Sequence, residues 1–328
     1  MANTTQNPRE SSKFFRSMRA EGRILGAALS YFTAFPVHAV FPSWSPTSQE
    51  LSGCLRYFGL VGCAVGGWAY FCYVGAHFFW SHSVAGLFAL TGGALATRAF
   101  HEDGLADFAD ALGGAFDRET AFKIMKDPRH GTFGVLALWS VMTLKWQLLV
   151  SVSEDLGTIF LALLTAHVLS RTGTWFLAAL GNDARRVQSS EARVEAKSAV
   201  ILQSPDDGPF QPATADLTPQ GERCQSQQRE FSTKVQGHHR AQEGLRAGFL
   251  QKGRAHLSGL VIHSFLVAGL MFLRPSEVSH AVMLGLLTVL QFHWGLKVWL
   301  GGYTGDCLGA CQQVLEVVCF GIFAACVR

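Results

Sequence analysis

The sequence predicts an all-α protein that crosses a lipid bilayer several times. Of its 328 residues, 49% are hydrophobic and only 16% are charged, whereas soluble domains carry about 25% charged residues. The hydrophobic residues lie in long blocks that are almost free of charge, and about 18–25 such residues suffice to span a bilayer as a helix. Seven such blocks exclude a soluble protein, and we treat residues 1–328 as a single membrane-embedded domain.

The seven predicted transmembrane helices cover residues 54–80, 83–100, 131–150, 157–180, 256–273, 279–300 and 307–327. Another apolar stretch, residues 24–41, comes first in the chain, but Pro36 interrupts it and Pro42 follows. Proline removes a backbone donor and breaks a helix interior. We therefore predict that this N-terminal segment is re-entrant or interfacial.

Lysine and arginine predict the orientation, because they collect in cytoplasmic connections. Residues 1–23, 98–130 and 181–255 are rich in these residues, and they alternate with connections in which Arg274 is the only basic residue. The pattern predicts a multi-pass protein of the inner or plasma membrane. Its cytoplasmic face would include residues 98–130 and the turn at 301–306. Residues 181–255 are polar with few aromatics, and such composition cannot offset chain entropy, so we predict a mostly disordered cytoplasmic loop.

An acidic cluster follows the second predicted span. Asp103, Asp107 and Asp110 are spaced i, i+4, i+7, which places them on one face of a helix. Neighbouring carboxylates raise one another's pKa unless cations lie between them, and Mg²⁺ uses carboxylate oxygens together with substrate phosphates. These three aspartates are predicted to be catalytic and to bind Mg²⁺ together with Glu102; the alternative is a solvated acidic face.

Glycines and cations follow the acidic cluster. Gly113 and Gly114 would end the helix and let the backbone approach a ligand, and Lys126, Arg129 and His130 add positive charge. A metal with cationic groups is typical of phosphoryl transfer. We predict a catalytic role for Lys126 and substrate binding for the other four. Lys126 and Arg129 would equally suit cations that reach the membrane surface at the start of the next helix.

The last polar elements are a glycine-rich turn and a buried arginine. Asp306 stands at the mouth of an apolar helix, where a charge is costly without a partner, so we predict a metal ligand; the alternative is the N-cap of that helix. Tyr303 and Thr304 in the same turn are predicted to bind substrate. Arg171, inside the fourth predicted span, suits a substrate phosphate or a structural ion pair equally well.

Three motifs in order resemble the cobalamin synthase family, the adenosylcobinamide-GDP ribazoletransferases. They are His-Glu-Asp-Gly-Leu-Ala-Asp at 101–107, Ile-Met-Lys-Asp-Pro-Arg-His-Gly-Thr-Phe-Gly-Val at 124–135 and Gly-Gly-Tyr-Thr-Gly-Asp-Cys-Leu-Gly-Ala at 301–310. Tyr-Phe-Thr-Ala-Phe-Pro-Val at 31–37 is similar to the family's N-terminal stretch. The likeness covers most of the chain outside 181–255, a segment that is longer than the family's linker. A second departure is Ala111, where the family's pattern has glycine.

The resemblance implies a reaction and its partners. Adenosylcobinamide-GDP would transfer its adenosylcobinamide-phosphate group to α-ribazole or α-ribazole 5′-phosphate, release GMP and form adenosylcobalamin or its 5′-phosphate, with Mg²⁺ required. The lipid bilayer is a further partner, no nucleic acid is expected, and a homo-oligomer is compatible with the sequence.

One alternative is a CDP-alcohol phosphotransferase, although its motif has arginine where Asp107 stands. Another is a cation transporter, although the acidic residues precede a span rather than lie within one.

Overall fold

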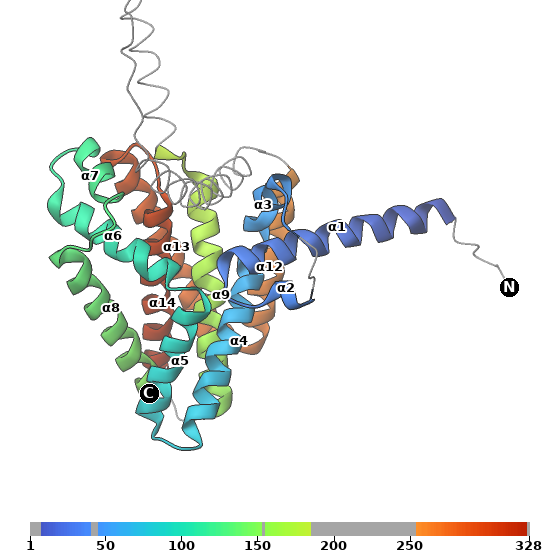
Figure 1. Cartoon of the computed structure of the whole chain (residues 1–328). Coiled ribbons are helices and arrows are strands. Elements are labelled where there is room, and N and C mark those ends of the chain that lie inside the picture. The colour runs from blue at the N-terminus through green and yellow to red at the C-terminus, as the bar shows by residue number, and fades with distance from the viewer. Residues whose placement is uncertain (1–7, 41–44, 153–154, 185–253, 327–328) are drawn as a thin grey trace, which may run out of the picture.

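The computed structural model describes residues 8–40, 45–152, 155–184 and 254–326 and confirms an all-α architecture (Figure 1). A short 3-10 helix, Cys54–Tyr57, joins α3 to α4. The helices are α1 (Pro8–Phe32), α2 (Val37–Val40), α3 (Ser48–Gly53), α4 (Phe58–His77), α5 (His82–Ala96), α6 (Phe100–Gly114), α7 (Arg118–Ile124), α8 (Thr132–Ser151), α9 (Leu156–Leu180), α12 (Arg254–Leu273), α13 (Pro275–Trp299) and α14 (Gly305–Cys326).

Five helical stretches in the described part of the chain are long and apolar enough to cross a membrane. They are Ser48–His77, which ends with α4, and the helices α8, α9, α13 and α14. α5 and α6 together would form a sixth, but the pair is bent by 88°, and Leu257–Leu273 of α12 is a shorter apolar helix. The chain is therefore a multi-pass membrane protein. Each of the seven predicted apolar blocks contains one of these helices, but only five of them, or six if the bent pair is one span, are long and apolar enough to cross, so the predicted number of seven spans is not reached in the described residues.

The predicted N-terminal segment is divided between two helices. α1 extends to Phe32, α2 begins at Val37, and Pro36 lies in the break between them. α1 projects sideways from the bundle, at a steep angle to α4 and α9 (Figure 1). It is not among the helices that are apolar enough to cross a membrane. The predicted 181–255 loop lies mostly outside the described residues.

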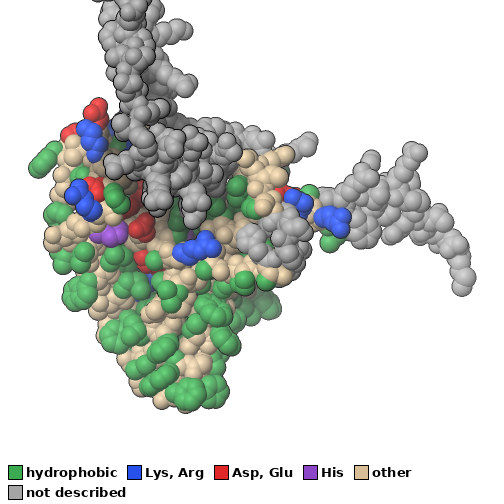
Figure 2. Space-filling model, viewed as in Figure 1, with side chains coloured by type: hydrophobic (Ala, Val, Ile, Leu, Met, Phe, Trp, Pro, Cys, Tyr) green, Lys and Arg blue, Asp and Glu red, His purple; other side chains and the backbone are tan. Residues whose placement is uncertain are grey.

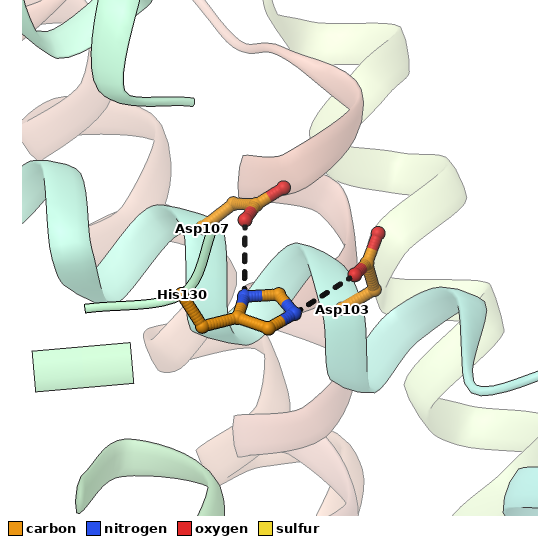
Figure 3. A group of neighbouring side chains, drawn as sticks. All are labelled: Asp103, Asp107 and His130. Atoms are coloured by element: carbon orange, nitrogen blue, oxygen red, sulfur yellow. Dashed lines mark ion pairs between the residues drawn. The ribbon is translucent and has the colours of Figure 1, made fainter. Parts of the chain in front are cut away.

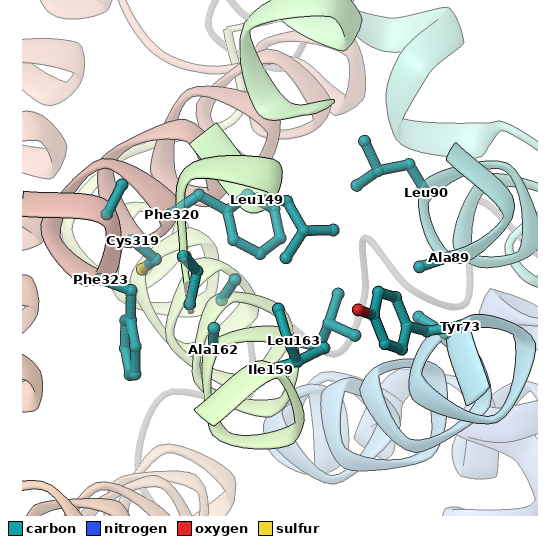
Figure 4. Packing of buried hydrophobic residues seen from close by; sticks show 14 of the residues in the cluster. Tyr73, Ala89, Leu90, Leu149, Ile159, Ala162, Leu163, Cys319, Phe320 and Phe323 are labelled. Carbon is teal, nitrogen blue, oxygen red and sulfur yellow. The ribbon is translucent and has the colours of Figure 1, made fainter. Parts of the chain in front are cut away.

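The bundle has an apolar core at one end and a charged surface at the other. Buried side chains of α4, α5, α8, α9 and α14 interlock in the core (Figure 4), among them Tyr73, Leu149, Leu163 and Phe320. Acidic and basic side chains gather on the visible face around α6 and α7, whereas the opposite end is largely hydrophobic (Figure 2). The charged end is also where the sequence placed the candidate site.

Close backbone contact joins α4 to α9. A Cβ atom built on Gly62 would lie 2.4 Å from the carbonyl oxygen of His167. Small residues permit such approach, and in a bilayer the resulting van der Waals contacts drive helix association. Gly67, on the same helix, has no atom within 4 Å of its would-be Cβ. The two glycines therefore form a matched pair for testing the contact.

Gly62→Ala is expected to lower the free energy of unfolding by about 1–3 kcal/mol. The added methyl group would collide with the carbonyl oxygen of His167, and a backbone atom inside a helix cannot move aside. Gly67→Ala is expected to leave stability unchanged or to raise it by up to about 1 kcal/mol, since alanine is the better helix former. Unfolding of the purified protein in detergent, followed by tryptophan fluorescence, measures both. Equal effects of the two substitutions would contradict the contact.

Candidate active site

The site forms where α6 crosses the start of α14. Arg98 and Ala99 adopt left-handed backbone conformations between α5 and α6, and this break turns the chain across the bundle. A Cβ atom on Gly104 would lie 3.1 Å from the carbonyl oxygen of Asp306, and one on Gly309 would lie 3.1 Å from that of His101. Glycines on both helices thus allow the backbones to touch, and Asp306 is brought beside the acidic helix.

Asp103, Asp107 and His130 form a group that suits a metal ion (Figure 3). The histidine Nε2 lies 3.6 Å from Asp103 Oδ1, and its Nδ1 lies 3.6 Å from Asp107 Oδ1. One ligand atom from each residue lies within 4.8 Å of the others. Two carboxylates and an imidazole fit a divalent cation that keeps open positions for water or substrate oxygens. His130, predicted to bind substrate, therefore joins the candidate metal ligands.

The electrostatics of this group favour a cation. Burial, followed by the negative charges of Asp103, Asp306 and Asp110, raises the pKa of Asp107 to about 6, while the neighbouring His130 acts in the opposite direction. A carboxylate with a raised pKa is destabilised in its charged form. A bound divalent cation would relieve this repulsion, so the arrangement fits the Mg²⁺ that the sequence suggested.

Asp110 has different partners from the other two aspartates. Its carboxylate is buried and accepts hydrogen bonds from the backbone N–H groups of Gly131 (2.6 Å) and Gly134 (2.8 Å). It thereby satisfies donors at the start of α8, which otherwise have no partner within the helix. The structure thus places Asp110 outside the group of Asp103, Asp107 and His130, in a position that holds the α8 start and the adjacent His130 against α6.

Asp110→Asn is expected to lower the free energy of unfolding by about 1–3 kcal/mol, because one of two charge-assisted hydrogen bonds to buried N–H groups is lost. Asp103→Asn should leave stability unchanged or raise it, since the Asp103 side chain is 63% exposed and its charge repels Asp107. Thermal unfolding in detergent without added metal compares the two. A larger loss for Asp103→Asn would contradict these assignments.

Glu102 and Arg171 belong to a buried network behind α6. Gln313 Nε2 donates to Glu102 Oε1 (3.0 Å), and Lys145 Nζ donates to Gln313 Oε1 (2.8 Å). Arg171 is buried and lies 3.6 Å from Glu316 Oε1. The structure therefore places Arg171 in an ion pair inside the bundle and Glu102 beside it. Neither residue belongs to the group formed by the two aspartates and His130.

The predicted cations and glycines lie around the acidic helix. Lys126 and Arg129 are exposed, and Arg129 makes a two-pronged contact with Asp127, through Nε (2.9 Å) and Nη2 (2.6 Å). Such an exposed pair contributes little to stability, so the arginine is available to an incoming phosphate.

A Cβ on Gly113 would lie 2.4 Å from the Phe133 ring, and thus this glycine serves packing against α8; its neighbour Gly114 is exposed.

Backbone pairing with the end of α9 holds the 301–306 turn. Tyr303 N–H donates to the carbonyl of Asn182 (2.9 Å), and Ala184 N–H donates to the carbonyl of Tyr303 (3.0 Å). The Thr304 hydroxyl accepts from Cys307 N–H (3.3 Å), which is the bond expected of an N-cap. Thr304 therefore caps α14, its hydroxyl also donates to Asp306 Oδ2 (3.3 Å), and Asp306 lines the cavity.

A cavity of about 240 Å³ opens next to Asp103. Its lining combines a wall of aromatic rings, from α1, α4 and α6, with polar groups of α6, the residues after α9 and the 301–306 turn. The lining includes Tyr31, Phe32, Leu55, Phe58, Phe100, His101, Asp103, Gly104, Thr174, Ala178, Asp183, Tyr303, Thr304, Gly305, Asp306, Leu308 and Gly309. It contains three of the predicted residues outside the metal-binding group: Tyr303, Thr304 and Asp306.

Sequence reasoning missed the aromatic wall and Asp183. Phe58 and Phe100 lie in apolar blocks, where nothing distinguishes a lining ring from a lipid-facing one. The motif at 31–37 did contain Tyr31 and Phe32, but only as part of a resemblance. Asp183 precedes the long polar segment, where acidic residues are common. The sequence showed that Lys145 is a charged residue within an apolar block, but it did not show that Gln313 and Glu316 are its partners.

Comparisons with known proteins identify a family. The model of the family described as cobalamin-5-phosphate synthase matches residues 24–203 and 233–324. An adenosylcobinamide-GDP ribazoletransferase of Shewanella piezotolerans is 32% identical over 93% of this chain and 96% of its own length. The enzyme of the same name from Shewanella frigidimarina is 44% identical over 44% of this chain and 54% of its own length. No solved structure matches.

Proposed function

Because this chain belongs to the cobalamin-5-phosphate synthase family, we propose that it is an adenosylcobinamide-GDP ribazoletransferase that depends on Mg²⁺. The observation that carries the proposal is the meeting of Asp103, Asp107 and His130 beside Asp306. These residues come from three separated motifs, and a phosphoryl transferase needs carboxylates and a divalent cation at one point. The proposal places this site on the cytoplasmic face of the inner or plasma membrane, as the basic connections predict.

The reaction would be a displacement at phosphorus. A ribose hydroxyl of α-ribazole or its 5′-phosphate forms a bond to the phosphorus that carries the cobinamide arm, and the bond from that phosphorus to the GMP oxygen breaks. Asp306 lines the cavity beside the metal-binding group, so its carboxylate is placed to accept the hydroxyl proton. Lys126 and Arg129 are exposed at the same end and would neutralise the leaving GMP.

The metal requirement follows from the same residues. Asp103, Asp107 and His130 would hold Mg²⁺, which when bound supplies positive charge to the phosphate oxygens. Carboxylates also bind Mn²⁺, and an imidazole favours the later metals, so the metal preference is a direct test of the ligand set. We expect Mn²⁺ to replace Mg²⁺ in the reaction.

The test is GMP release from adenosylcobinamide-GDP by the protein in lipid vesicles, with α-ribazole and the divalent cation each present or omitted. Release that requires both supports the transferase. Release without α-ribazole would indicate a hydrolase instead. Absence of release from a folded protein under all conditions would overturn the proposal.

A further inference from the structure

We propose that the cavity beside Asp103 binds the aromatic base of the ribonucleoside acceptor, with the ribose directed toward Asp103 and Asp306. The inference rests on the proposed function and adds to it, because it assigns one of the two substrates, and one part of that substrate, to a specific cavity. Three features support it: the wall of aromatic rings, the position of the carboxylates and the size of the space.

The aromatic wall is built by three separate segments, and Tyr31 and Phe100 are its more exposed rings, whereas Phe32 and Phe58 are almost fully buried. The rings of Tyr31 and Phe32 from α1 lie 5.0 Å apart, and Phe32 lies 4.6 Å from Phe58 of α4. Phe100, at the start of α6, lies 6.3 Å from Tyr31. Nucleic-acid bases stack on such rings, because every base has a flat π-face. A planar ligand is therefore the natural occupant of this wall.

The carboxylates of Asp103 and Asp306 line the same cavity. Asp103 belongs both to the cavity lining and to the candidate metal site, and Asp306 lies beside it. A ligand whose base stacks on the aromatic wall would thus place its sugar hydroxyls next to the groups that perform the transfer. This is the orientation that a nucleophilic ribose requires.

The chemistry of the wall favours the acceptor over the guanosine of the donor. The base of α-ribazole is dimethylbenzimidazole, which carries two methyl groups and one free acceptor nitrogen. Guanine has several donors and acceptors, and burying them without partners is costly. Phe32, Phe58 and Phe100 offer no hydrogen bonds, and the polar side chains of the lining, among them Asp183 and Thr304, come from other segments of the chain. The corrin ring of the donor, in turn, is far larger than a space of about 240 Å³ and must remain outside.

Two substitutions test the assignment, Tyr31→Leu and Phe100→Leu, with Phe116→Leu as control. Tyr31 and Phe100 are at least partly exposed, so the protein should still fold, and Phe116 is fully exposed and outside the cavity. Equilibrium dialysis measures α-ribazole binding to the vesicle-embedded protein without donor. We expect the Kd and KM for α-ribazole to rise about tenfold to a hundredfold in both variants, with the KM for adenosylcobinamide-GDP unchanged and the control unaffected.

The outcomes separate the cavity assignment from the reaction. A rise in the KM for adenosylcobinamide-GDP alone would overturn the assignment in favour of guanosine. GMP release with unchanged constants in both variants would overturn it and leave the reaction standing. Binding of α-ribazole that depends on Tyr31 and Phe100, in a protein that releases no GMP, would support the cavity assignment and overturn the proposed reaction.

Discussion

Replacing Asp107 with asparagine is expected to lower GMP release about a hundredfold to a thousandfold. Asp107 is half-buried and lies 3.6 Å from His130. Solvent therefore screens its charge less than it would screen the charge of an exposed carboxylate. The substitution removes one formal charge and one ligand oxygen from the candidate metal site while the shape of the side chain is kept. A higher concentration of Mg²⁺ should be needed for half-maximal activity, and that concentration is the second quantity to measure.

Asp117→Asn is the matched control for this experiment. Asp117 is exposed and caps α7, where its side chain accepts a hydrogen bond from Thr120 N–H (2.8 Å). Asparagine is an equally good N-cap, so activity and Mg²⁺ dependence should match those of the unchanged protein. An Asp107→Asn variant that is as active as this control, at the same Mg²⁺ concentration, would remove Asp107 from the site.

Glu316→Gln is expected to lower the free energy of unfolding by about 3–5 kcal/mol. The Glu316 carboxylate is buried between two cations, Lys145 Nζ at 2.8 Å and Arg171 Nη1 at 3.6 Å. His167 Nδ1 lies 2.8 Å from the same group. Removing the charge takes from both buried cations the carboxylate with which they pair, which is the costly way to break a buried ion pair.

Two further variants show whether burial of the charges causes the loss of stability. Lys145→Met should lower the free energy of unfolding less than Glu316→Gln does, because Glu316 still forms its ion pair with Arg171. Glu277→Gln is the control: the Glu277 side chain is only 10% exposed and pairs with Arg274 at 3.3 Å, but the arginine side chain is 36% exposed, so water can solvate the arginine once the charge is removed, and a loss of only about 1 kcal/mol is expected. Unfolding in detergent provides the comparison, and a loss for Glu277→Gln as large as that for Glu316→Gln would contradict the role of the network.

Several features of the site were accessible to sequence reasoning because they are local. A helical spacing of four residues places Asp103 and Asp107 on one face, and the structure shows both beside His130. The same spacing argument included Asp110, but the N–H groups of Gly131 and Gly134 bind that carboxylate. Helical periodicity predicts which side chains share a face of one helix. It does not predict which groups of another helix form hydrogen bonds with them.

The amino-acid sequence alone was enough to predict a bundle of apolar helices with a cluster of acidic residues at one of its connections. This follows because a helix in a bilayer satisfies its own backbone hydrogen bonds, and so its length and composition suffice to identify it. The fold was needed to show that Arg171 pairs with Glu316 and that rings from α1, α4 and α6 line one cavity. These contacts join residues far apart in the chain, and the close approach of helix backbones at small residues brings the helices together. The cap of α14 is local, but both Thr304 and Asp306 suit an N-cap by residue type, and the backbone geometry selects Thr304.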